Sequence, residues 1–359
     1  MRLKPSNRLR HLVVPTVVAT LTLAGATAAG GEAPAGVTQP MAVTDDAVDY
    51  VVAISVDGLN PTAIRQLGPS RTPALHRLIA EGATTLNART SVEETITLPN
   101  HSGMVTGRRI AVAAGGHGIR FNNDNGTTIH RHAGEYVASM FDVAHDRGRS
   151  TALYTAKDKF NVLNRSWTAR TGAPDSTGTN QGRDKIDRYR LDTETTNVTR
   201  LIADLRQTPD HLSLVHLAHP DRFGHDHGFM SDRYLRAVEQ ADHQVGRILN
   251  AIDDNTRLRR HTSVILTADH GGDGDGHSTR TDPANYTVPF MVWGVGVPAG
   301  TDLYTLNGTN RRDPGTSRPR YDGTQPIRNG EVANLALDLL DLPPVRNSQF
   351  NARQDLVVR

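Results

Sequence analysis

The chain has 359 residues, a formal net charge of +2 and no cysteine. The absence of cysteine excludes a disulfide framework and the lipid attachment of bacterial lipoproteins. The length is ample for a large buried core, so core packing and any bound metal must hold the fold.

The first residues have the pattern of a secretory signal. Residues 1–28 combine a basic start, a mostly apolar run at 12–24 and a small-residue cleavage site at 26–28. The run is too short to span a membrane. We therefore expect a secreted protein, extracellular or periplasmic, without a membrane span after signal removal. Loss of the signal removes four basic residues and changes the formal charge from +2 to about −2, so no nucleic-acid-binding footprint is expected.

The remaining chain divides by composition. Residues 29–46 are rich in Ala, Gly and Pro and predict a flexible linker. A catalytic domain is expected at 47–345, with a polar loop or small cap at about 160–196 and a second irregular insertion at 311–328. Residues 346–359 form a C-terminal tail.

Apolar strands and amphipathic helices alternate along the catalytic domain. Strands are predicted from about Val51, Thr151, Leu212, Ser263 and Val288, and helices at 73–81, 134–147, 197–206, 231–254 and 332–342. This alternation predicts an α/β fold with a mainly parallel central sheet and helices on both faces. In such sheets, ligands bind at the carboxyl ends of the strands.

The first of these strand ends carries a carboxylate, because Asp57 follows the apolar run 51–56 and precedes a glycine. The run 263–268 ends similarly in Asp269 and His270, with His277 further on. Unneutralised carboxylates and imidazoles gathered at a strand end are costly. The pattern therefore favours a bound cation, and oxygen and nitrogen donors suit zinc.

The strand at 212–217 is followed by a third set of such donors. Asp221 and His225 are four residues apart, which places them on one face of a helical turn where both can reach one ion. His216 and His219 flank the same strand end, and we expect supporting or structural roles for them. The triplet 226–228 repeats the Asp-His-Gly pattern within a polar loop and is not expected to bind metal.

A helix is predicted to start at Thr97, which is a good N-cap residue, with Pro99 in its first turn and Gly107 at its end. A hydroxyl at this position lies where backbone N–H groups favour phosphate.

Five motifs then occur in one order: Asp-Gly-Leu at 57, Thr-Leu-Pro-Asn-His at 97, His-Gly-Ile-Arg-Phe-Asn at 117, Asp-x-x-Gly-His at 221 and Asp-His-Gly-Gly at 269. This set resembles the type I phosphodiesterase/nucleotide pyrophosphatase family of the alkaline phosphatase superfamily. The resemblance covers roughly residues 48–342 and implies an alkaline phosphatase-like fold.

The resemblance also implies a two-zinc phosphoric-ester hydrolase that acts on a small-molecule phosphate ester or nucleotide. One zinc would be held by Asp57, Thr97, Asp269 and His270, and the other by Asp221, His225 and His277. Thr97 would be the nucleophile and would form a covalent phosphothreonine, and Asn122 would donate to a phosphoryl oxygen. Manganese or mixed metal occupancy also fits these donors.

Two lysines leave the substrate class open. Lys157 and Lys159 follow the strand from Thr151 and lie two apart, so in extended chain they share a face. Added cations favour a monoester, which carries more negative charge than a diester. Phosphonoacetate hydrolases have a similar Lys-Asp-Lys, and superfamily monoesterases a similar Lys-x-Arg. A phosphomonoesterase (alkaline phosphatase) or a phosphonoacetate hydrolase-like enzyme is therefore the alternative. A metal-dependent mutase and a non-catalytic metal- or phosphate-binding protein are more remote.

Overall fold

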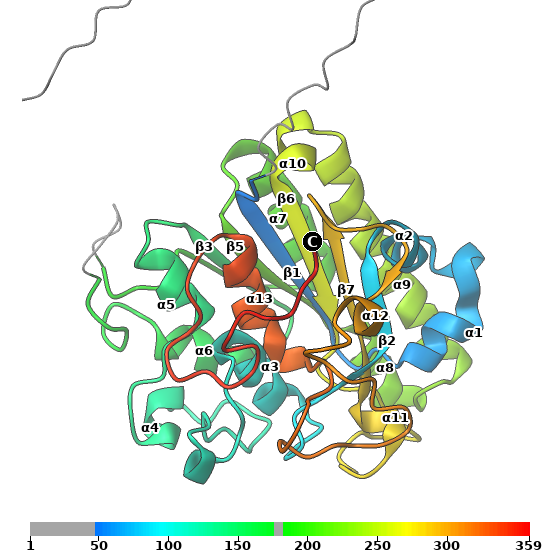
Figure 1. Cartoon of the computed structure of the whole chain (residues 1–359), viewed down its shortest axis with the longest axis horizontal. Coiled ribbons are helices and arrows are strands. Elements are labelled where there is room, and N and C mark those ends of the chain that lie inside the picture. The colour runs from blue at the N-terminus through cyan, green and yellow to red at the C-terminus, as the bar shows by residue number, and fades with distance from the viewer. Residues whose placement is uncertain (1–46, 176–181) are drawn as a thin grey trace, which may run out of the picture. The chain divides into compact units, whose positions relative to one another are not determined.

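The computed structural model describes residues 47–175 and 182–359, so the expected signal (1–28) and linker (29–46) lie outside the described residues. The core is an eight-stranded sheet in the order β4-β3-β5-β1-β6-β7-β2-β8 (Figure 1). The strands are β1 Tyr50–Val56, β2 Ala83–Arg89, β3 Thr151–Thr155, β4 Arg188–Leu191, β5 Leu212–Leu217, β6 Thr262–Thr267, β7 Thr287–Gly294 and β8 Thr301–Asp302.

The centre of the sheet is parallel. β1 pairs in parallel with β5 on one side and β6 on the other, and β3 and β4 extend this parallel half. All residues of β1, β5 and β6 are buried, as expected for apolar strands covered on both faces. Beyond β6, β7 runs antiparallel to both β6 and β2. The α/β class with a mainly parallel sheet is confirmed.

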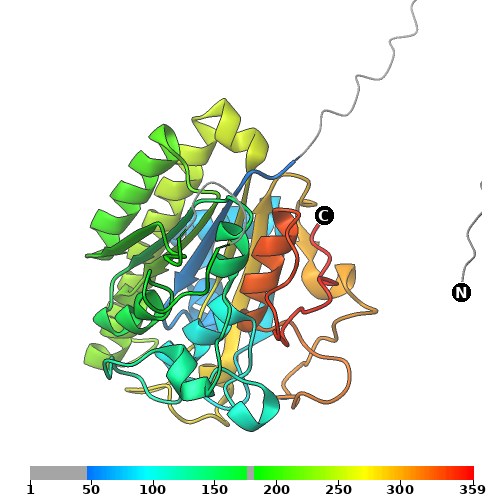
Figure 2. The same ribbon diagram turned by 90° about the vertical axis from the view of Figure 1, so that its left-hand side faces the viewer.

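Helices cover both faces of the sheet. Figure 2 shows α7 and α9 on one side and α13 on the other, and α7 contacts β3 and β5 while α13 contacts β1 and β6. The helices are α1 Pro61–Arg71, α2 Pro73–Glu81, α3 Thr97–Thr106, α4 Ile129–Ala133, α5 Met140–His145, α6 Asn161–Ser166, α7 Glu194–Gln207, α8 His219–His227, α9 Asp232–Asp253, α10 Thr256–His261, α11 Pro283–Tyr286, α12 Leu303–Leu306 and α13 Val332–Leu339. Short 3₁₀ turns lie at Val112–Ala114, Asp158–Phe160 and Asn329–Glu331.

Several predicted elements have different bounds. The helix expected at 134–147 forms only as α5, because Gly134 ends α4 in the left-handed region (φ 75°) and Ser139 starts α5 with a capping box. Thr97 is the first residue of α3 rather than its N-cap, which is Ile96. The Thr97 hydroxyl contacts another side chain and does not cap the helix. The segment expected as a polar loop at about 160–196 contains α6 and the edge strand β4.

The C-terminal residues pack against the rest of the fold. The segment 346–359 has no helix or strand, yet Phe350, Leu356 and Val358 are buried. The insertion at 311–328 is irregular, as its composition predicts. In the part of the chain described, no helix is both long and apolar enough to cross a membrane.

Candidate active site

The register of three strands brings the polar strand ends together. Ser55 in β1 lies opposite His216 in β5 and Thr267 in β6, so the residues that follow these strands meet at one edge of the sheet. Gly58 makes the closest approach there. Its N–H donates to Asp269 Oδ1 (3.1 Å), its φ is 70°, and a side-chain carbon at this position would lie 3.0 Å from the Cα of Asp221. Only glycine fits this turn.

The first group of donor atoms surrounds His270. Its Nε2 atom lies 3.1 Å from Asp269 Oδ2, 3.5 Å from Asp57 Oδ1 and 3.8 Å from Asp221 Oδ1. The Thr97 hydroxyl oxygen lies 3.3 Å from the same nitrogen. All five side chains are buried. The chain therefore brings three carboxylates, an imidazole and a hydroxyl from four separate segments into one cluster.

The second group consists of Asp221, His225 and His277. Asp221 Oδ1 lies 3.5 Å from His225 Nε2 and 3.4 Å from His277 Nε2, and the two nitrogens are 3.0 Å apart. The Nδ1 atom of each histidine faces a backbone carbonyl, that of Asp275 and that of Thr95. We therefore assign the protons of the neutral rings to Nδ1. Both Nε2 lone pairs then point at each other.

This arrangement fits a bound cation at both groups. Asp57 Oδ1, Asp221 Oδ1 and Asp269 Oδ2 are buried and have no hydrogen-bond donor among the described residues. Two nitrogens 2.0–2.1 Å from one tetrahedral zinc would be roughly 3.3 Å apart, close to the spacings around His225 and His277. A metal ion would satisfy the orphaned oxygens and remove the lone-pair repulsion, so the residues present suit the ions that the sequence implies.

The pKa values within the cluster show its excess of negative charge. Burial alone would lower the pKa of His270, but the Asp269 carboxylate raises it to about 9. Burial and the charge of His270 lower the pKa of His277 to about 3. Burial would raise the pKa of Asp57, yet Lys157 and His216 hold it well below its usual range. The cluster thus binds positive charge, here as a proton and an ammonium group.

Thr97, at the start of α3, lies beside Asn122, which comes from the loop that follows the helix. The backbone N–H of Leu98 donates to Asn122 Oδ1 (2.9 Å), which fixes the Asn122 amide beside the Thr97 backbone. With its oxygen occupied in this way, Asn122 keeps its NH₂ group as a donor. His101, one turn further along α3, donates from Nδ1 to the Thr97 carbonyl (2.9 Å), and its Nε2 lies 2.8 Å from the Ser55 hydroxyl oxygen.

Both predicted lysines are at the cluster, but they differ. Lys157 Nζ lies 2.7 Å from Asp57 Oδ2 and 2.5 Å from Asp221 Oδ2. Burial would lower its pKa, whereas the two carboxylates raise it well above its usual range. Lys159 has no carboxylate partner among the described residues, and burial together with Lys157 lowers its pKa. Lys159 is therefore the cation that remains available for an anionic ligand.

Comparison with known proteins points to the same family as the five sequence motifs. The family described as type I phosphodiesterase/nucleotide pyrophosphatase matches residues 51–275. The chain belongs to this family. It is also 34% identical to rat ectonucleotide pyrophosphatase/phosphodiesterase family member 1 over 61 residues, which are 17% of this chain and only 7% of the length of the rat protein.

Solved structures of related phosphodiesterases confirm the alkaline phosphatase-like fold. Murine ectonucleotide pyrophosphatase/phosphodiesterase 5 superposes with a TM-score of 0.57 at 15% identity, covering 86% of this chain and 99% of the murine one. An inactive threonine-to-alanine variant of that protein, in complex with AMP, gives the same values. The human counterpart gives a TM-score of 0.55 at 15% identity, with the same coverage.

His216, for which a supporting or structural role was expected, contacts a carboxylate of the candidate site. His216 Nε2 lies 2.8 Å from Asp57 Oδ2. A histidine inside an otherwise apolar strand was the available signal. The sequence analysis gave no role to His101, which lies 3.5 Å from Asp269 Oδ2. His101 belongs to the motif that begins at Thr97, and only the threonine of that motif was interpreted. The Asp-His-Gly triplet at 226–228 ends α8 with both side chains exposed, away from the two donor groups.

Proposed function

We propose that the protein is an exported two-zinc phosphodiesterase of the nucleotide pyrophosphatase kind, which works through a covalent phosphothreonine. The observation that carries the proposal is the position of the Thr97 hydroxyl, 3.3 Å from His270 within a buried cluster of unsatisfied carboxylate oxygens. Membership of the family supports hydrolysis of phosphoric esters. Residues 1–28, outside the described part, supply the argument for export.

Two donor sets are available for the metal ions. Asp57, Thr97, Asp269 and His270 would hold one ion, and Asp221, His225 and His277 the other. Asp221 Oδ1 lies within reach of both sets, 3.8 Å from His270 Nε2 and 3.4 Å from His277 Nε2. Oxygen and nitrogen donors favour zinc, and manganese or mixed occupancy is compatible. When bound, the ions lower the pKa of the Thr97 hydroxyl and neutralise charge on the attacking and leaving oxygens.

Thr97 and the groups around it have different roles in the proposed phosphoryl transfer. Thr97 Oγ1 forms a bond to phosphorus while the bond from phosphorus to the leaving-group oxygen breaks. Water then attacks the phosphothreonine, releases the phosphate product and restores the hydroxyl. The Asn122 NH₂ group and the backbone N–H of Thr97 would donate to the equatorial phosphoryl oxygens. Phosphoryl transfer depends mainly on positioning and electrostatics, which this set of residues supplies.

A nucleotide is the substrate that the family resemblance favours. The murine relative was solved in complex with AMP, and we extend that ligand class to this chain as part of the proposal. The buried donors bind the phosphate rather than the base, so they are equally suited to other small phosphoric esters.

A phosphomonoesterase or phosphonoacetate hydrolase-like activity is the second candidate. The observation in its favour is Lys159, whose ammonium group has no carboxylate partner among the described residues and lies near Lys157. A dianionic substrate would gain more from this cation than a diester does.

Parallel assays with bis(p-nitrophenyl) phosphate and p-nitrophenyl phosphate test the two candidates. The proposal expects the diester to be the better substrate, and activity to be lost on chelation and restored by zinc. Phosphate recovered on the peptide that contains Thr97 after an acid quench would support the covalent step. Absence of both hydrolysis and trapped phosphate in zinc-loaded protein would favour a non-catalytic binding protein.

A further inference from the structure

Phe229 packs against both histidines of the second donor set. Its ring centroid lies 5.9 Å from that of His225 and 6.1 Å from that of His277. Both contacts are edge-to-face, with interplanar angles of 77° and 81°, which is a favourable arrangement for aromatic rings. The side chain of Phe229 is buried. One buried ring therefore lies against the two imidazoles that are proposed to bind the same ion.

Two glycines leave the space that this ring occupies. A side-chain carbon on Gly224 would lie 2.6 Å from the ring of Phe229, and one on Gly272 would lie 2.3 Å from it. Neither glycine has a positive φ, so backbone conformation does not require glycine there. Gly224 belongs to the motif Asp-x-x-Gly-His and Gly272 to the motif Asp-His-Gly-Gly. Both positions need glycine because Phe229 fills the place of a side chain.

The backbone around Phe229 is held in a costly conformation. Gly228 has a φ of 86° and Met230 a φ of 67°, in the left-handed region that is unfavourable for methionine. The N–H of Phe229 donates to the carbonyl of Gly274 (2.7 Å), in the turn that leads to His277. This hydrogen bond joins the end of α8 to the loop after β6. The two segments that carry the second donor set are thus fixed to each other through Phe229.

Tyr234 on α9 supports the ring of Phe229. The two ring centroids are 5.3 Å apart. The Tyr234 hydroxyl donates to the carbonyl of Gly58 (2.8 Å) and accepts from the N–H of Asn60 (2.9 Å). Asn60 donates from its side-chain amide to the carbonyl of Gly272 (3.2 Å). The support is therefore itself attached to the turn after β1 and to the loop after β6.

We propose that Phe229 is a positioning residue for the second donor set, whose ring holds His225 and His277 in the geometry that binds one ion. The inference rests on the proposed function, because it requires this donor set to bind a metal. His225 needs such support, since its side chain is 47% exposed. Its rotation is limited only by the contact of Nδ1 with the Asp275 carbonyl (3.0 Å) and by neighbouring rings. An unsupported imidazole would lose more rotational entropy on binding the ion.

Zinc titration by calorimetry tests the positioning role without turnover. The unsubstituted protein should bind two zinc ions per chain. Phe229→Ala should weaken binding of the second zinc roughly tenfold or more and leave the first zinc in place, because only the second donor set loses its support. Phe229→Leu keeps apolar volume without a flat ring and should give an intermediate affinity. His277→Ala removes a ligand and identifies which binding step belongs to the second set.

Phe223 provides a matched control on the same helix. Its ring packs against His219 and His227, which are not ligands, with centroids 6.1 Å and 5.7 Å away. Phe223→Ala removes an aromatic ring from α8 as Phe229→Ala removes one from the turn after it. The control should keep the affinity for the second zinc.

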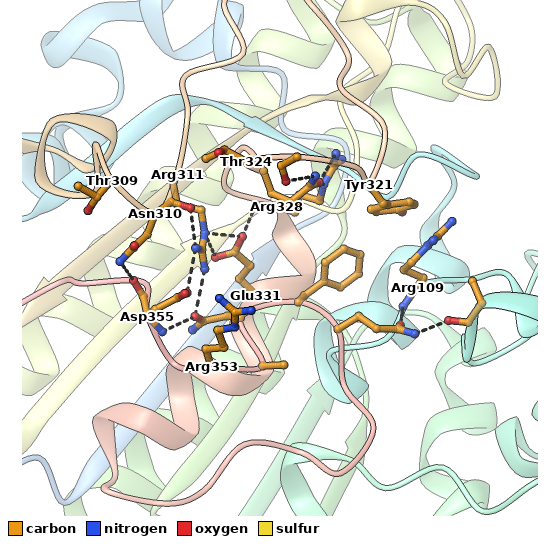
Figure 3. Close-up of a pocket in the computed structure, with 17 residues that line it drawn as sticks. Arg109, Thr309, Asn310, Arg311, Tyr321, Thr324, Arg328, Glu331, Arg353 and Asp355 are labelled. Atoms are coloured by element: carbon orange, nitrogen blue, oxygen red, sulfur yellow. Dashed lines mark hydrogen bonds and ion pairs between the residues drawn. The ribbon is translucent and has the colours of Figure 1, made fainter.

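Phe350 provides a control for the packing of a ring against a glycine. A side-chain carbon on Gly330 would lie 2.2 Å from the ring of Phe350, which is buried. Phe350 lines a pocket of about 740 Å³ in which Arg311 pairs with Glu331 (3.1 Å) and Asp355 (2.9 Å) (Figure 3). The described lining of this pocket includes none of the second donor set. Phe350→Ala should therefore also leave the second zinc unaffected.

A double-mutant cycle separates positioning from a general loss of stability. Gly272→Ala alone should weaken the second zinc, because the added carbon displaces the ring of Phe229. In the Phe229→Ala background, the same substitution should have a much smaller effect, since the space is already vacant. Urea unfolding of each metal-free variant gives its stability, against which the change in zinc affinity is compared.

Equal affinity for the second zinc in Phe229→Ala and both control variants would overturn the inference, as would additive effects of Phe229→Ala and Gly272→Ala. Binding of a single zinc by the unsubstituted protein would overturn it too. If Phe229→Ala does not fold, equal affinities in Phe229→Leu, Gly272→Ala and the controls are the contradicting result. If the second zinc is selectively weakened but the unsubstituted protein does not hydrolyse bis(p-nitrophenyl) phosphate, the catalytic proposal fails and the positioning role stands.

Discussion

His216 donates from Nε2 to Asp57 Oδ2 across 2.8 Å, and this contact sets the direction of the Asp57 carboxylate. The other ring nitrogen of His216 accepts from the backbone N–H of Ala156 (3.3 Å), which fixes the tautomer. Asp57 Oδ1 is left without a donor and faces His270 Nε2 at 3.5 Å. The histidine thus turns one carboxylate oxygen toward the proposed metal.

Replacing His216 by Ala should weaken zinc binding by roughly 10- to 100-fold, because Asp57 Oδ2 loses one of the two donors, His216 and Lys157, that orient the carboxylate. His216→Gln, which can still donate to the carboxylate, should recover part of the affinity. Zinc titration by calorimetry at constant pH is the measurement, with His243→Ala on the exposed side of α9 as the control. Unchanged zinc affinity in His216→Ala would show that the contact has no role in positioning Asp57.

Thr97→Ala should reduce diester turnover by roughly a thousandfold or more, because the proposed nucleophilic oxygen is lost. Thr97→Ser keeps the oxygen and should retain measurable turnover and a covalent phosphoryl group. Mass spectrometry of acid-quenched protein reads the second outcome. Full activity in Thr97→Ala would mean that water attacks the substrate directly.

Lys159→Ala should lower kcat/KM for p-nitrophenyl phosphate by roughly tenfold, equivalent to about 1.4 kcal/mol, while the diester changes much less. The reason is that the monoester carries the additional negative charge near this unpaired ammonium group. Lys159→Arg preserves the charge and should preserve the ratio of the two rates. Equal effects on both esters would remove the argument for monoester preference.

How much of this site the sequence predicts depends on where each residue lies. Asp57 and the Asp269-His270 pair are direct extensions of buried apolar strands, so strand pattern and the carboxyl-end rule place them correctly at one edge of the sheet. The i, i+4 spacing of Asp221 and His225 likewise matches α8.

Other features depend on tertiary contacts, which the hydrophobic periodicity of the sequence does not reveal. The ion pairs of Lys157 with Asp57 and Asp221 join residues more than 60 positions apart. Strand β2 was not recognised, because its polar residues gain burial only by pairing with β7 and β8. The course of the irregular insertion at 311–328 could not be predicted either, because hydrogen bonds from Arg89 and Arg328 to its backbone carbonyls hold it in place.

Acid should destabilise the metal-free protein partly through His117. Burial lowers the pKa of this side chain to about 3, and its Nδ1 accepts from the backbone N–H of Ile119. The unfolded chain therefore binds the proton first, at its ordinary pKa near 6.5. The stability contribution is complete above about pH 6.5 and is lost as the pH falls toward 3, with a slope of about 1.4 kcal/mol per pH unit.

Urea unfolding at pH 6.5, 5.5 and 4.5 measures this slope. His117→Gln, which does not titrate, should show a dependence on pH that is smaller by about one proton. His243→Gln at an exposed position should leave the slope unchanged. An identical slope in His117→Gln and the unsubstituted protein would show that His117 is not buried as a neutral ring.

The most direct test of the account is zinc-edge anomalous diffraction from crystals of zinc-loaded protein with bound phosphate. We expect two peaks, one among Asp57, Thr97, Asp269 and His270 and one among Asp221, His225 and His277, with the phosphate beside the Thr97 hydroxyl. A single peak, or peaks remote from these side chains, would contradict it.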